Sequence, residues 1–121
     1  MRIEEFLDLE VLHERMELIP EALIQIILAF PKNTSPLSIL IADALRAGDM
    51  PRAEALFHKL RGESSLVGAT ALMQFCEYLE EQSHQGQIPE EDLARLIGIT
   101  GKTESALTFF LGQSSPSEVP K

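Results

Sequence analysis

Apolar side chains recur every three or four residues in several separate segments of this sequence, and this spacing is the strongest constraint on its fold. A pattern with a period of 3.6 residues places its apolar side chains on one face of an α-helix. Such faces occur at Leu23-Ile26-Ile27-Phe30, at Ala53-Leu56-Phe57-Leu60 and at Leu72-Phe75-Cys76-Leu79. Because each face has to be buried against another helix, the pattern predicts an all-α protein.

Proline, glycine and aspartate mark where the predicted helices begin and end. Pro20 and Pro89 suit a first helical turn, where the missing amide hydrogen costs nothing. Asp8 and Asp49 are placed to cap the helices that follow them, and Gly48 is placed to end a helix. The helix that Gly48 ends has an expected core face of Leu37, Leu40, Ile41, Ala44 and Leu45.

Two prolines interrupt the apolar pattern between residues 30 and 37. Pro31 and Pro36 each lack the amide hydrogen that a helix interior uses. We therefore expect a break or a sharp kink here, with Ser35 capping a new helix that begins at Pro36.

The last predicted helix carries Glu90, Glu91 and Asp92 in its first turn, as the helix dipole favours. Its expected core face is Leu93, Ile97, Thr100, Leu107 and Leu111, with a weak point between Gly98 and Gly101. We expect one helical domain over residues 1–112. The Ser/Pro-rich stretch 113–121 is predicted to be a disordered tail.

Charge and composition exclude several classes of partner. The 121 residues include 10 Lys and Arg against 19 Asp and Glu, a net charge of −9, which disfavours nucleic acid and anionic lipid. We recognise no apolar run of membrane length and no secretory signal, so we expect a cytoplasmic protein without a membrane partner. Its single cysteine, Cys76, is expected to pack in the core.

His58 is expected to face water on the helix that contains residues 53–62, about 150° from the centre of the apolar face. Arg61 and Gly62 lie one turn further along the same side, and Ser65 continues that side if the helix extends so far. A helical glycine costs about 1 kcal/mol relative to alanine, and open access to the imidazole is one explanation for it. The segment 46–61 is also locally basic, with Arg46, Arg52, Lys59 and Arg61.

Residues 57–69 resemble the motif of the histidine phosphotransfer (HPt) domains, in which a histidine is followed by any residue, Leu, Lys, Gly, small residues and a Gly-Ala pair. The matching residues are His58, Leu60, Gly62, Ser64, Ser65, Gly68 and Ala69, followed at the usual helical spacing by Leu72, Cys76, Leu79 and Glu80. Arg61 stands where the family has lysine, which keeps the charge but changes its shape. The resemblance extends over roughly residues 8–111.

The resemblance implies an up-and-down four-helix bundle of the HPt type with an additional short N-terminal helix. It implies that His58 accepts a phosphoryl group from the aspartyl phosphate of one receiver domain and passes it to another. Arg61 would stabilise the transferred charge, and Gly62 would give the partner access. The residues expected to contact that partner are Lys59, Ser65, Leu66 and Gly68.

The implied partners are the receiver domains of response regulators and hybrid sensor histidine kinases. Mg²⁺ is expected in the receiver, and no cofactor or metal is expected in this chain. We expect a monomer that is not an enzyme, because the sequence contains no nucleotide-binding or hydrolase motif.

Three alternatives stay open. In the first, the chain is an inactive relative that binds receivers without transferring the phosphoryl group. In the second, it is an unrelated acidic helical adaptor. In the third, it is a di-metal bundle that uses Glu10-x-x-His13 and Glu81-x-x-His84. The metal alternative is the weakest, because such a site also needs inward-facing glutamates from two further helices.

Overall fold

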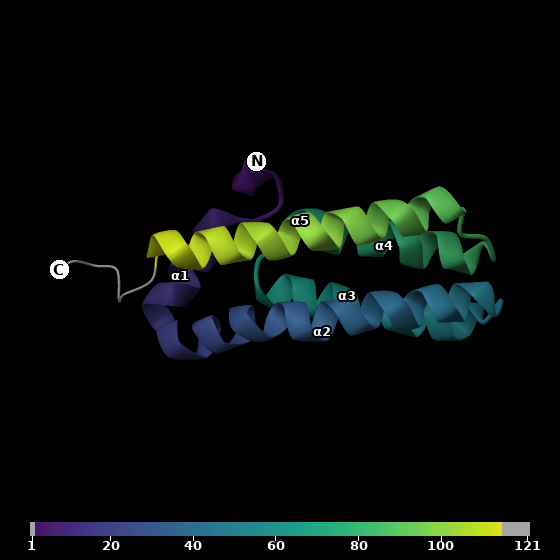
Figure 1. The fold of residues 1–121 in the computed structure, drawn as a ribbon, viewed down its shortest axis with the longest axis horizontal. Coiled ribbons are helices and arrows are strands. Elements are labelled where there is room, and N and C mark those ends of the chain that lie inside the picture. The colour runs from purple at the N-terminus through teal and green to yellow at the C-terminus, as the bar shows by residue number, and fades with distance from the viewer. Residues whose placement is uncertain (1, 115–121) are drawn as a thin grey trace.

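A computed structural model describes residues 2–114 of the chain, and this part is helical. A short 3₁₀ turn, η1 (Ile3–Glu5), precedes α1 (Leu9–Leu18), α2 (Pro20–Arg46), α3 (Met50–Leu66), α4 (Thr70–His84) and α5 (Glu90–Ser114). Helices α2 to α5 run up and down beside one another, and α1 lies at the end of the bundle where α2 begins and α5 ends (Figure 1). The predicted all-α bundle with an additional N-terminal helix is confirmed.

The centre of the bundle is filled by the faces predicted for α3 and α4. Ala53, Phe57 and Leu60 of α3 are buried, as are Leu72 and Leu79 of α4. Close packing occurs between α2 and α3, α3 and α4, α4 and α5, and α5 and α2, so the four helices form a closed ring. The α3–α4 pair and the α2–α5 pair are therefore opposite sides of the bundle.

The predicted break between α2 residues 30 and 37 is wrong. Pro31 and Pro36 lie inside one continuous helix, although a proline in a helix interior costs about 3 kcal/mol. The reason is the core face, which continues through both prolines in steps of four and three residues: Leu23, Ile27, Phe30, Thr34, Leu37, Ile41 and Ala44 are all buried. Ser35 is therefore a helix-interior residue and not a cap.

Thr34, which lies between the two prolines, also ties α2 to α5. It is fully buried, and its hydroxyl Oγ1 lies 2.6 Å from Glu104 Oε2 and 2.9 Å from the Phe30 carbonyl oxygen. A hydroxyl has one proton to donate, and the closer, charged carboxylate is the stronger acceptor. Packing of the buried face and this hydrogen bond to α5 both stabilise α2 between the two prolines.

Two predicted core positions are wrong. Leu40 is 38% exposed and Ile97 is 52% exposed. On α5 the predicted Thr100 and Leu107 are buried, and the rest of the buried face is formed by Leu96, Thr103, Ala106 and Phe110. Both faces have helical spacing, and the positions of α2 and α4 decide which one is buried.

Helix is present on both sides of Gly98 and Gly101, as predicted, and it is unbroken between them, while the weak point expected there stays a prediction. Helix α5 ends at Ser114, two residues beyond the predicted domain boundary at 112. The rest of the predicted tail, residues 115–121, lies outside the described residues.

The capping residues predicted at Asp8 and Asp49 are confirmed. Asp8 accepts a hydrogen bond from the Val11 amide, and Asp49 accepts one from the Arg52 amide, each at 3.2 Å. Gly48, which follows the C-cap residue Ala47 of α2, has a φ of 71°, a conformation that favours glycine. Helix α3 therefore begins where its sequence indicates, and this fixes the direction in which His58 points.

The expectation that no apolar run has membrane length does not hold for α2. This helix is long and apolar enough to cross a membrane by length and composition, with a mean hydropathy of 1.2 in an 18-residue window. The core helix of a soluble protein meets the same criterion, and α2 packs its buried face against α3 and α5.

Candidate functional site

His58 projects from α3 into solvent, as the sequence predicts. Its neighbours in the chain, Phe57 and Leu60, are fully buried, so the helix turns His58 away from the core. The His58 side chain is 69% exposed. An imidazole in this position is open to a macromolecular partner.

Arg61 lies beside the imidazole and connects it to α4. Its Nη2 is 2.8 Å from His58 Nδ1, and its Nε is 2.7 Å from Glu80 Oε2. A second carboxylate, Glu77 Oε2, lies 3.6 Å from Arg61 Nη1. Because the guanidinium is held from both sides, it has a defined position next to the imidazole.

Glu80 is a site residue that we did not predict. Its Oε1 lies 3.4 Å from His58 Nδ1, and its side chain is only 18% exposed. In the sequence, Glu80 stands out only as part of the family spacing. A usable signal was its place on α4 beside the buried Leu79, at the border between the core face and the polar face that carries Glu77 and Glu81.

The ring of His58 is contacted on one nitrogen. Within residues 2–114, both of its polar contacts, to Arg61 and to Glu80, are made by Nδ1. Nε2 makes no such contact in this part of the chain. Of the two ring nitrogens, Nε2 is therefore the one without a polar contact in the described residues.

Gly62 is exposed one turn from His58, and packing does not explain it. A Cβ atom added at this position would meet nothing within 4 Å. Because Gly62 has no side chain, the surface next to the imidazole is unobstructed at this position, as the predicted role in giving a partner access to His58 requires.

The residues predicted to contact a partner do not all lie on the surface. Lys59 and Ser65 are exposed, and Leu66 is 52% exposed at the end of α3, so α3 extends one turn beyond Gly62. Their role in binding stays a prediction. Gly68 is instead buried, and its φ of 65° and the Asp8 carbonyl oxygen 3.4 Å from its missing Cβ indicate a structural role under α1.

The other two histidines have contacts that differ from those of a metal site. The His13 ring packs against the Phe110 ring with centroids 5.5 Å apart, and His84 Nε2 lies 2.7 Å from Glu54 Oε2 of α3. In residues 2–114 no group of three or more His, Cys, Asp or Glu side chains is placed to hold a metal ion. Neither predicted Glu-x-x-His pair is therefore part of a larger ligand set in the described residues.

The predicted basic surface is partly neutralised by α4 and by α2 itself. Arg61 pairs with two glutamates of α4, and Arg46 lies 3.9 Å from Asp43. The cation that contacts the His58 ring is Arg61, which two glutamates of α4 pair with, within a surface of mixed charge.

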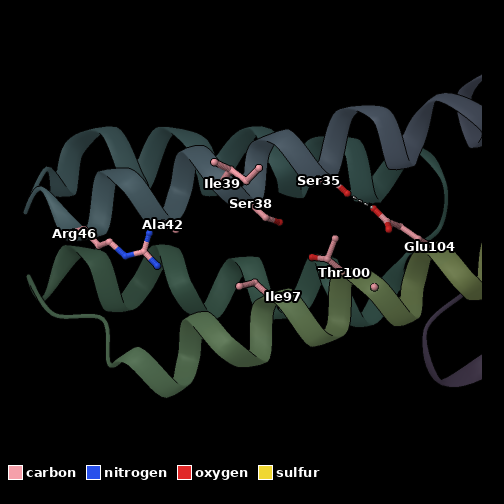
Figure 2. A pocket seen from close by; sticks show the side chains of 9 residues that line it. Ser35, Ser38, Ile39, Ala42, Arg46, Ile97, Thr100 and Glu104 are labelled. Carbon is pink, nitrogen blue, oxygen red and sulfur yellow. Dashed lines mark hydrogen bonds between the residues drawn. The ribbon is translucent and has the colours of Figure 1, made fainter.

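A cavity of about 480 Å³ lies on the other side of the bundle, between α2 and α5. Figure 2 shows Ile39 and Ala42 on α2 facing Ile97 and Thr100 on α5, with the hydrogen bond between Ser35 and Glu104 at one end. None of the predicted site residues lines this cavity, so the candidate site is the projecting cluster on α3 and α4.

Comparison with known families agrees with this geometry. The Hpt domain matches residues 9–107, which cover α1 to most of α5. Neither the comparison with curated proteins nor that with solved structures gave a match. Domains of this family are generally soluble phosphotransfer carriers that act in phosphorelays with receiver domains and have no kinase activity. With a match over most of its length and an exposed histidine in the motif, this chain belongs to the Hpt domain family.

Proposed function

We propose that this chain is a phosphorelay intermediate in which His58 carries the phosphoryl group between two receiver domains. The observation that carries the proposal is the exposed imidazole whose Nε2 is uncontacted in the described residues, with a fixed guanidinium beside it. The side chain that is missing at Gly62 supports the approach of a bulky partner.

In the proposed reaction the Nε2 lone pair of His58 attacks the phosphorus of the partner's aspartyl phosphate in line with the leaving carboxylate. A P–N bond forms, the P–O bond breaks, and its electron pair goes to the aspartate carboxylate. Arg61 then lies where it can stabilise the charge of the phosphoryl oxygens. In the return direction the imidazole is the leaving group.

The proposed partners are the receiver domains of response regulators and hybrid sensor histidine kinases, and Mg²⁺ would be bound by the receiver. Lys59, Ser65 and Leu66 extend the exposed surface around His58 along α3. We further propose that the protein is a cytoplasmic monomer that has no cofactor and does not act as a kinase.

The test is phosphoryl transfer from a receiver domain labelled on its aspartate. We expect the wild-type protein to become labelled with an acid-labile, alkali-stable bond, and we expect His58→Gln to lose labelling completely. His84→Gln is the matched control, because His84 is similarly exposed at 64% but lies at the end of α4. Labelling of His58→Gln at the wild-type rate would contradict the proposal. Receiver binding without labelling of the wild type would indicate an inactive adaptor instead.

A further inference from the structure

The contact between Arg61 and His58 fixes where the proton of a neutral imidazole lies. A guanidinium has only donors, so the 2.8 Å contact between Nη2 and Nδ1 requires Nδ1 to offer its lone pair. In the neutral ring the single proton is then on Nε2.

This proton position makes the exposed nitrogen unreactive. A ring nitrogen that carries hydrogen has its remaining electron pair in the aromatic system, so Nε2–H cannot attack phosphorus. The in-plane lone pair on Nδ1 is taken by Arg61 and faces α4. In this arrangement His58 has no lone pair that is free for a partner in solvent.

Glu80 offers the opposite arrangement. Its Oε1, 3.4 Å from Nδ1, is an acceptor and would favour a proton on Nδ1, which leaves the Nε2 lone pair free. The same carboxylate holds Arg61 through Oε2, at 2.7 Å from Nε. Arg61 and Glu80 therefore compete for Nδ1, and only one of the two contacts is a hydrogen bond in a given tautomer of the neutral ring.

A phosphoryl group is the ligand that would change the outcome of this competition. It presents several charged oxygens, which bind a guanidinium through two parallel hydrogen bonds, whereas Nδ1 offers one neutral acceptor. The Arg61 side chain is 33% exposed and lies on the solvent side next to the imidazole, so its end group can be reached by an incoming phosphate.

We infer that Arg61 is a positioning residue that keeps His58 in the unreactive tautomer, and that an incoming phosphoryl group draws the guanidinium away and allows Glu80 to hold the proton on Nδ1. The inference rests on the proposed phosphotransfer function. The proton balance is simple, because Nε2 gives one proton to water and Nδ1 takes one from water. Of the charged groups that contact the ring, Arg61 comes from α3 and Glu80 from α4, and Glu77 of α4 lies against Arg61.

The test is the tautomer of His58 in the free protein, measured by two-bond ¹H–¹⁵N correlation of ¹⁵N-histidine-labelled protein at a pH where the ring is neutral. We expect the wild type to carry its proton mainly on Nε2. Arg61→Met keeps the apolar stem and removes the donors, so the ratio of the Nδ1–H to the Nε2–H form should rise about tenfold. Lys59→Ala removes a neighbouring cation and should leave the ratio unchanged.

An unchanged tautomer ratio in Arg61→Met, or an equal change in Lys59→Ala, would overturn the inference. The measurement uses no receiver and no phosphoryl donor, so its failure is separate from a failure of the relay function.

Discussion

Polar side chains are paired differently on the α3–α4 side and on the α2–α5 side of the bundle. Between α3 and α4, charged side chains meet across the helix pair at the surface, in the pairs Arg61–Glu80, Arg61–Glu77 and Glu54–His84. Between α2 and α5, one carboxylate, Glu104, lies within hydrogen-bonding distance of the hydroxyls of Thr34 and Ser35 at the end of a cavity with largely apolar walls.

The comparison shows that the cavity between α2 and α5 and the candidate reactive group, His58, lie on opposite sides of the bundle. A concave apolar surface is the usual mark of a site for a small molecule. A nucleophile that reacts with another protein instead has to project into solvent, and the side chains beside it have to be small. On the α3–α4 side the projecting group is His58, and Gly62 beside it has no side chain.

Among variants that keep His58, the largest effect should come from matched glycine substitutions on the two sides of the bundle. Gly62 and Gly101 are both helical and exposed, and a Cβ at either would meet nothing within 4 Å. Gly62→Leu should slow transfer from a receiver at least about tenfold, because the new side chain stands in the way of the partner. Gly101→Leu should leave the transfer rate unchanged.

The measurement is the initial rate of labelling at a fixed receiver concentration, with thermal unfolding as a check on folding. Neither variant should melt below the wild type, because leucine is a better helix former than glycine. Equal transfer rates in the two variants would show that access at residue 62 does not matter.

A smaller effect is expected on the other side of the bundle. Thr34→Val removes the hydroxyl that lies 2.6 Å from Glu104 Oε2 and should lower the free energy of unfolding by about 1–3 kcal/mol. Transfer to His58 should stay at the wild-type rate. Urea unfolding measures the change, and Ser35→Ala is the control, since Ser35 is exposed and its contact with Glu104 is longer, at 3.3 Å. An equal loss in both variants would contradict a special role for Thr34.

The smallest effect should be a pH-dependent one at Glu63, on the α2-facing side of α3. Burial raises the pKa of Glu63 above 4.5, and the charge of Lys59 partly opposes this shift. A carboxyl group with a raised pKa in the folded state loses stabilising energy as the pH rises through that pKa. The difference in melting temperature between Glu63→Gln and the wild type should therefore be larger, in favour of the variant, at pH 7 than at pH 4. The transfer rate should stay unchanged. A gain that is the same at both pH values would contradict burial as the cause.

The sequence predicted most where the relevant residues are close together along the chain. His58, Arg61 and Gly62 lie within about one turn of one helix, so helical geometry alone places them side by side. The caps at Asp8 and Asp49 are equally local and were confirmed. Glu80, in contrast, is 22 residues from His58, and their contact depends on how α4 packs against α3.

The errors have the same physical origin. Pro31 and Pro36 oppose a helix locally, but buried residues before and after them belong to one core face, and tertiary packing outweighs the local cost. For Leu40 and Ile97 the periodicity allowed two adjacent faces, and only the neighbouring helices select one. In each case the missing information was the position of another helix.

Helix α1 and the residue before it are attached to the α3–α4 turn by two different kinds of hydrogen bond. The Asp8 amide donates to the Gly68 carbonyl oxygen at 2.8 Å, and the Arg15 guanidinium donates to the Leu66 carbonyl oxygen, so α1 is anchored to main-chain atoms at the α3–α4 turn. The Asp8 contact is made by a backbone amide and does not depend on side-chain identity, whereas the other contact requires the Arg15 side chain. The C-terminal end of the helix that carries His58 is therefore tied to α1 through one main-chain donor and one side-chain donor.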